Sequence, residues 1–152
     1  MNEPADYPHL LSSIEIAGKR LRNRVVFASV YTGFARNGEV TDELIAFHAN
    51  RARGGVAMIV TEPLAMWRGQ TEVALVRVGG NQSRGQLQRW AEAVLRHDCH
   101  LVGQVQDAGR GDVRPMRKLS AVAPSSLPDD LSWTMPRSLT GGEISGMLDD
   151  FA

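Results

Sequence analysis

The sequence predicts an α/β fold: a partial TIM (β/α)8 barrel, made of an N-terminal hairpin and about three βα units. Residues 25–28 and 56–60 are short, wholly apolar runs, as in strands that are covered on both faces. Segments with one apolar helical face separate and follow these runs. Buried strands that alternate with helices pair in parallel through right-handed crossovers, so the pattern favours a barrel, with a doubly wound sheet as the alternative.

The chain opens with a predicted tail and a predicted hairpin. Residues 1–9 contain two prolines and two acidic residues and no apolar core, so they are expected to form a tail and not a secretory signal. Residues 14–16 and 20–22 flank the short glycine turn Ala17-Gly18-Lys19. Alternating residues on both sides of such a turn are typical of a small β-hairpin.

The middle of the chain predicts two helices and a third strand. Thr41 supplies an N-cap ahead of the acidic pair Asp42-Glu43, and Gly54-Gly55 ends the helix that follows. A second amphipathic helix is expected over 82–97, and an apolar strand over 101–105. The resulting order is hairpin, strand, helix, strand, helix, strand.

The last part of the chain predicts a long loop and a final helix. Residues 107–138 are rich in proline and show little periodicity, which predicts a long loop. Long loops of this kind more often have a function than serve only as connections. Thr140 and Glu143 have the spacing of a capping box, and apolar residues at helical spacing follow them.

The domain organisation follows from the number of strands. A closed barrel typically takes about 250 residues, whereas three parallel strands leave two unpaired edges and an uncovered inner face. We therefore expect residues 1–152 to be the N-terminal part of a single barrel domain: a gene fragment, a truncated reading frame or half of a split protein.

Composition excludes several classes of partner and location. The 17 basic and 17 acidic residues are spread along the chain, so no footprint for nucleic acid or an anionic membrane is visible. No apolar run has the length of a membrane span. A single cysteine, Cys99, is expected to be a small buried hydrophobe, and the expected location is the cytoplasm.

The histidines do not predict a metal site. His9, His48, His97 and His100 are scattered and lack metal-ligand spacing with carboxylates or with Cys99. We interpret His48 as a residue on a helix face and the other three as residues at the ends of elements.

Polar residues gather where the predicted strands end. In a parallel barrel they would share the C-terminal rim, where active sites of such folds lie. Gln104 stands out because its amide, inside an apolar strand, needs both a hydrogen-bond donor and an acceptor as partners. A heterocycle can supply donors and acceptors, and a neighbouring backbone group or a buried water is the alternative. The set comprises Ser29, Tyr31, Thr32, Thr61, Glu62, Gln104, Gln106 and Asp107.

Several segments, in order along the chain, resemble the old yellow enzyme and 2,4-dienoyl-CoA reductase family. The segment that leads into the first predicted strand is similar to the family's L-K-N-R pattern, and a later one to Q-L-x-H-A-G-R. Within the family, residues 28–33 look closer to the dienoyl-CoA reductase and amine dehydrogenase branch than to the classical yellow enzymes. The segments are Leu21–Val26, Thr41–Phe47, Arg51–Gly55, Ile59–Glu62, Gln104–Arg110, Val122–Ser125 and Pro136–Thr140.

The resemblance implies an FMN-dependent NAD(P)H oxidoreductase. It implies that backbone groups of Ser29, Val30 and Tyr31, the residue at Pro63 and the amide of Gln104 contact the isoalloxazine ring. Tyr31 stands where relatives carry Thr, Cys or His, so it is a candidate for tuning the flavin. Pro63 stands where many relatives carry Gly or Ala, and proline has no N–H to offer.

By the same resemblance, the substrate is a small electrophilic alkene or an amine. An iron-sulfur cluster and FAD are implied only if a dienoyl-CoA-reductase-type C-terminal part exists. The family's substrate-binding and proton-donating residues come from later strands, so no catalytic residue is assigned and the chain is expected to be inactive alone. Expected partners are a homo-oligomer or a complementing C-terminal half. The alternative is a non-catalytic remnant or an interaction module that pairs through its exposed strand edges.

Overall fold

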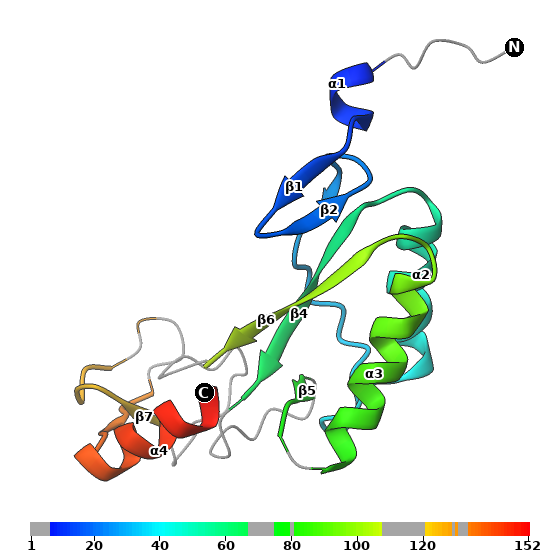
Figure 1. The fold of residues 1–152 in the computed structure, drawn as a ribbon. Coiled ribbons are helices and arrows are strands. Elements are labelled where there is room, and N and C mark those ends of the chain that lie inside the picture. Colours follow the sequence, from blue (N-terminus) through cyan, green and yellow to red (C-terminus); the bar gives the residue numbers. More distant parts are fainter. Residues whose placement is uncertain (1–6, 67–74, 80, 108–120, 129, 131–133) are drawn as a thin grey trace, which may run out of the picture. The chain divides into compact units, whose positions relative to one another are not determined.

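The computed structural model describes residues 7–66, 75–79, 81–107, 121–128, 130 and 134–152, which form two compact units (Figure 1). The first unit comprises residues 1–65 and 72–105, and the second comprises residues 66–71 and 106–152. We treat the two units separately.

The first unit begins with a short helix and the predicted hairpin. Helix α1, Pro8–Leu11, starts inside the segment expected to be a tail, with proline in its first turn, where a missing N–H costs nothing. Strands β1, Ile14–Ile16, and β2, Lys19–Leu21, pair antiparallel. Ala17 and Gly18 both have positive φ, 48° and 71°, which matches the right-handed twist of the two strands. The structure thus confirms the hairpin.

The main sheet of this unit is built around one long strand. Strand β4, Met58–Ala65, pairs in parallel with β3, Val26–Phe27, and, nearer its carboxyl end, with β5, Val76–Arg77. Strand β6, His100–Gln106, also pairs with β4. Figure 1 shows the arrows of β4 and β6 pointing the same way.

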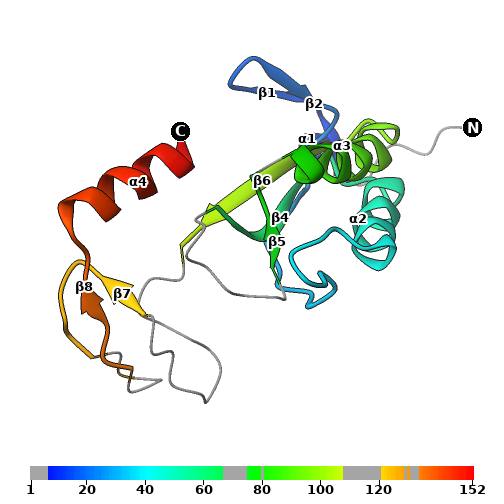
Figure 2. The same ribbon diagram turned by 90° about the horizontal axis from the view of Figure 1, so that it is seen from below.

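Two helices cover this sheet. Helix α2, Asp42–Arg53, starts at the predicted N-cap, because the Thr41 side chain accepts a hydrogen bond from the backbone N–H of Leu44. Helix α3, Asn81–Leu95, packs against α2, and Figure 2 shows both helices on the same side of β4 and β6. Strand, helix, strand, helix and strand therefore follow one another as the sequence predicts.

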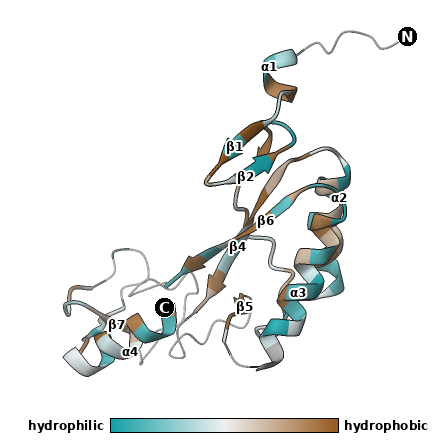
Figure 3. Ribbon diagram, in the orientation of Figure 1, coloured by the Kyte–Doolittle hydropathy of each residue, from teal (hydrophilic) through white to brown (hydrophobic). Residues whose placement is uncertain are grey.

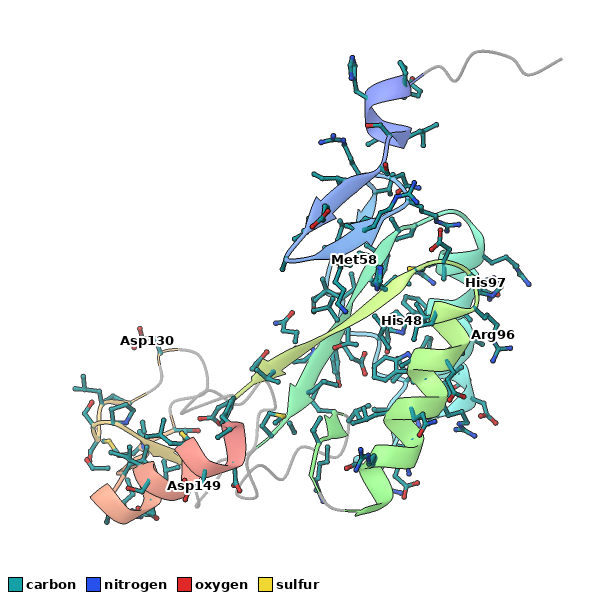
Figure 4. The ribbon with its side chains drawn as sticks, viewed as in Figure 1. His48, Met58, Arg96, His97, Asp130 and Asp149 are labelled. Carbon is teal, nitrogen blue, oxygen red and sulfur yellow. The ribbon has the colours of Figure 1, made fainter. Side chains whose placement is uncertain are left out.

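The core lies between these helices and the sheet. Figure 3 shows hydrophobic residues along much of β4. Ile59 and Val94 belong to one buried cluster, while Leu44 and Trp90 belong to another. His48, labelled in Figure 4, is only 1% exposed and its ring lies 5.2 Å from that of Trp90. The predicted helix-face position of His48 is thus the inward face.

The second unit contains two short strands and a helix. Strands β7, Val122–Ala123, and β8, Arg137–Ser138, pair in parallel inside the segment that sequence analysis interpreted as a loop. Helix α4, Gly141–Phe151, opens with the predicted capping box of Thr140 and Glu143. Arg137 donates two hydrogen bonds to the Glu143 carboxylate, at 2.9 and 2.6 Å. The start of α4 is thereby tied to β8.

One predicted strand differs clearly from the structure in length, and three short strands were not predicted. The predicted strand over 56–60 runs five residues further, to Ala65, because the polar pair Thr61-Glu62 continues as strand and does not begin a loop. The strands β5, β7 and β8 were not predicted, since each has only two residues and no period can be read from so short a run.

Candidate functional site

The carboxyl ends of three neighbouring strands hold most of the polar residues singled out from the sequence. The same stretch of β4 binds β3 and β6, so these two strands lie on its opposite edges. The backbone N–H of His100 donates to the carbonyl of Ala57, and the N–H of Gln104 donates to the side chain of Thr61. From the first bond to the second, the partner advances by four residues towards the carboxyl end on each strand, from Ala57 to Thr61 and from His100 to Gln104. The two strands β4 and β6 therefore run parallel.

The predicted ring-contacting residues occupy this common end. Ser29, Val30 and Tyr31 follow β3 after one intervening residue, Ala28. Pro63 lies in the second half of β4, and Gln104 lies in the second half of β6. The structure therefore places all five residues at one end of one sheet, as a shared ligand would require.

Gln104 is held by its backbone and leaves its amide available. Its backbone N–H donates to the hydroxyl oxygen of Thr61 at 3.1 Å. Its side chain is half-buried, and among the described residues none forms a hydrogen bond with the amide group. The alternative of a neighbouring backbone partner for the amide therefore finds no support within the described residues.

The loop after β3 presents exposed residues and a free backbone. Val30 is 47% exposed and Tyr31 is 57% exposed. Within the part of the chain that the structure describes, no backbone hydrogen bond involves Ser29, Val30 or Tyr31. Because backbone N–H and C=O groups need partners when they are covered, this stretch can accept a ligand that brings its own donors and acceptors.

Pro63 lies between the two parts of β4 that pair with β3 and with β5. The first part pairs at Met58 and Ile59, and the second at Leu64 and Ala65. The missing N–H of proline thus falls in the gap between two ladders, where its loss breaks no pairing with either strand. Its half-buried ring and its carbonyl are the groups that it can offer.

The loop after β3 is fixed at one point by a buried carboxylate. Glu62 is 0% exposed, and its Oε2 accepts hydrogen bonds from the backbone N–H and the hydroxyl of Thr32, at 2.8 and 2.5 Å. The Thr32 hydroxyl oxygen in turn accepts from the N–H of Phe34 at 3.1 Å. From the sequence, Thr32 and Glu62 were predicted only as polar residues of the rim, and no local signal indicated that they bond to each other.

The first motif of the resemblance has a structural role. Arg22 donates from Nη2 to the carbonyls of Ala52 and Val56, at 2.8 and 3.0 Å. Asn23 donates from Nδ2 to the carbonyl of Gly55 at 2.8 Å and accepts from the N–H of Val25 at 3.0 Å. These side chains hold the turn between α2 and β4 against the start of β3, and so set the position of both strands.

Cys99 and His48 lie in the core. Burial raises the pKa of the Cys99 thiol to about 11, and the side chain is 1% exposed, which confirms its interpretation as a small buried residue. Burial also lowers the pKa of His48 to about 4, and its Nδ1 lies 3.2 Å from the carbonyl oxygen of Leu44. Neither residue faces the strand ends.

The described residues contain no group of three or more His, Cys, Asp or Glu side chains that could hold a metal ion. None of the described helices is both long and apolar enough to cross a membrane. Residues 108–110, the last part of the Q-L-x-H-A-G-R resemblance, lie outside the described residues.

Comparison with known proteins identifies the family of the chain. The family model of the NADH:flavin oxidoreductase / NADH oxidase family matches residues 9–152. The chain belongs to this family. Its members use FMN with a nicotinamide as reductant.

Two curated relatives of this flavin oxidoreductase chain are bacterial. It is 34% identical over 143 residues to a metal reductase of Desulforamulus reducens, covering 94% of the chain and 21% of the relative. It is 31% identical over 149 residues to an NADH oxidase of Thermoanaerobacter brockii, covering 95% and 23%. The chain thus spans between a fifth and a quarter of the length of these relatives.

The fold is that of the same family's barrels. The chain superposes on the Old Yellow Enzyme from Pichia sp. AKU4542 with a TM-score of 0.83 at 18% identity, covering 94% of this chain and 40% of that one. At this identity the likeness shows the fold alone. The prediction of a partial TIM barrel is confirmed, and the unpaired strand edges belong to a barrel that the chain forms only in part.

Proposed function

We propose that this flavin oxidoreductase chain supplies one wall of an FMN site. The ring would lie against the backbone of Ser29, Val30 and Tyr31, the Pro63 position and the amide of Gln104. The amide of Gln104 carries this proposal, because it is half-buried at the carboxyl end of β6 without a partner among the described residues. An amide offers both a donor and an acceptor, which suits the alternating N–H and C=O groups along the pyrimidine edge of a flavin.

When bound, FMN would supply hydride transfer from NADH or NADPH to a small electrophilic alkene; with an amine substrate, the amine would be the hydride donor and the electrons would pass on to a separate acceptor. The residues of this chain orient the ring and do not take part in the transfer. Tyr31 is placed to alter the surroundings of the ring, because it directly precedes the fixed residue Thr32 and remains 57% exposed.

The relatives support a long enzyme of the dienoyl-CoA reductase and amine dehydrogenase type. A single barrel takes about 250 residues, whereas 143 aligned residues are only 21% of the metal reductase. An iron-sulfur cluster and FAD belong to this proposal only together with such a further part. Catalysis would then need segments that follow this chain in its relatives, as a continuous polypeptide or as a complementing half, in a cytoplasmic enzyme that forms a homo-oligomer.

The experiment is flavin binding by the full-length gene product. We expect the purified protein to be yellow and to release FMN on denaturation. Gln104→Leu, which has a similar volume but no amide, should raise the dissociation constant for FMN roughly tenfold or more, because buried ring polar atoms lose a hydrogen-bond partner.

Gln88→Leu on the exposed face of α3 is the matched control and should leave the dissociation constant unchanged, since Gln88 bonds only the nearby Glu92 within the described residues. A colourless wild-type protein that binds no added FMN would overturn the proposal. The comparisons do not favour the alternative of a non-catalytic remnant or interaction module.

A further inference from the structure

Glu62 is a buried acid that the proposed contacts with the flavin do not use. Its side chain lies in β4 and is 0% exposed. Its Oε2 accepts two hydrogen bonds from Thr32, whereas its Oε1 is buried without a hydrogen-bond partner among the described residues. None of the ion pairs between described residues includes Glu62. Burying a carboxylate with an unpaired oxygen lowers the stability of the fold, so such a residue is expected to have a structural or functional role.

What these bonds fix is the end of the loop after β3. Thr32 directly follows Tyr31, and both its backbone N–H and its hydroxyl are bound by the same carboxylate oxygen. Its hydroxyl oxygen also accepts from the N–H of Phe34, so the chain is held on both sides of Gly33. Gly33 has a positive φ of 67°, a conformation that glycine adopts without strain. The chain is therefore held at a fixed point beside Tyr31.

The other end of the same loop is fixed by the sheet. Phe27 pairs with Ile59 of β4, and residues 29–31 span the interval between this pair and Thr32. Since both anchors, Ile59 and Glu62, belong to the same strand, both ends of residues 29–31 are tied to β4. No described hydrogen bond holds the backbone of residues 29–31 itself.

We infer that Glu62 is a positioning residue for the cofactor: through Thr32 it holds the backbone of Ser29, Val30 and Tyr31 where that backbone would contact a bound flavin ring. The inference rests on the proposed FMN site. It gives the carboxylate a role through Thr32, whose two bonds to Glu62 fix the end of the loop that carries Tyr31.

The test uses the full-length protein with Thr32→Val, which removes the hydroxyl but keeps the side-chain shape, and Thr32→Ser, which keeps it. Glu62→Gln keeps an acceptor for Thr32 but removes its charge. We expect Thr32→Val and Glu62→Gln each to raise the FMN dissociation constant roughly tenfold, since hydrogen bonds to a charged group are lost or weakened. Thr32→Ser should stay within about twofold of the wild type.

Two further readouts separate positioning from general stability. At saturating FMN, Thr32→Val and Glu62→Gln should shift the visible absorption bands and the midpoint potential of the flavin, because the ring then meets a displaced backbone. The double variant should be less than additive, as expected for residues that act through one contact. Thr140→Val removes a hydroxyl from the cap of α4, and should lower thermal stability without moving the bands or the potential.

The outcomes distinguish the two proposals. A wild-type protein without FMN affinity would overturn the FMN site and the role of Glu62 together. A wild type that binds FMN, with spectra, potential and affinity unchanged in Thr32→Val and Glu62→Gln, would overturn the role of Glu62 and leave the FMN site standing. If Glu62→Gln does not fold, Thr32→Val against Thr32→Ser still decides the question.

Discussion

The hydroxyl of Thr61 in β4 accepts a hydrogen bond from the backbone N–H of Gln104 in β6, across 3.1 Å. A side chain thus takes the place of a ladder carbonyl at the point where the two strands approach their carboxyl ends. Thr61 is 2% exposed, so without this bond its hydroxyl oxygen would have little access to water as a partner. The bond fixes the strand position from which the amide of Gln104 projects.

Replacing Thr61 should therefore affect both stability and the site. Thr61→Val has nearly the same shape but leaves the Gln104 N–H without an acceptor, which should lower the free energy of unfolding by about 1–3 kcal/mol. Thr61→Ser keeps the oxygen and should lose less than Thr61→Val. Urea unfolding of the protein measures the difference. Equal stability of Thr61→Val and the wild type would show that the bond contributes nothing.

The turn between α2 and β4 should depend on Asn23. Asn23→Ala removes the donor to the Gly55 carbonyl and the acceptor for the Val25 N–H, and Asn23 is only 9% exposed. We expect a loss of roughly 1–3 kcal/mol in the free energy of unfolding, since two part-buried backbone groups lose their partners. Asn50→Ala, on the exposed side of α2, is the control and should change stability by less than about 0.5 kcal/mol. Similar losses in both variants would contradict a clamp at Asn23.

Acid should weaken the first unit through His48. Burial lowers the pKa of His48 in the folded protein from 6.5 to about 4, so the imidazole is neutral there while it gains a proton in the unfolded chain. This contribution to stability is complete above pH 6.5 and is lost as the pH falls towards 4. We expect the thermal midpoint to drop between these values, and His48→Phe, which has no proton to gain, to drop less. Parallel profiles of the two proteins would refute the assignment to His48.

The start of α4 should respond to acid at lower pH. The side-chain hydrogen bonds from Arg137, followed by those from Thr140, lower the pKa of Glu143 from 4.5 to about 2. The resulting stabilisation is present above pH 4.5 and is lost as the pH falls through about 2.

Hydrogen exchange of the amides in the first turn of α4 should accelerate over this interval. Glu143→Gln should show fast exchange already at neutral pH, because it weakens both the capping box and the link to Arg137. Asp149→Asn, at the exposed end of the same helix, is the control. Equal protection of the first turn in both variants would contradict the assignment.

The spacing of apolar residues along the sequence was enough to predict the longer helices and strands. Thr41, Gly54 and the apolar positions of α2 define that helix locally, and the structure confirms its start at Asp42. The apolar run at 56–60 predicts a buried strand, but the strand continues through the polar pair Thr61-Glu62. It continues because these side chains bond to other segments, to Gln104 and to Thr32, and such partners cannot be read from local sequence.

The candidate site, too, could be predicted from the sequence only in part. The sequence places Ser29, Pro63 and Gln104 after or within apolar strands, and parallel pairing then puts them at one end of a sheet. The FMN contacts of these residues stay a prediction. The positioning role of Glu62 could not be predicted from the sequence, because a single acidic residue in a strand is equally consistent with a position at the rim.

The order of strands and helices, the caps of α2 and α4, and the polar residues at the strand ends were determined by the sequence alone, because periodicity, capping and alternation are local properties. Only the tertiary structure decided that Glu62 turns inward to Thr32, that Thr61 tethers Gln104, and that Arg22 and Asn23 hold the turn at Gly55. These bonds join residues far apart along the chain, and their partners are fixed by the packing of β3, β4 and β6 around one core.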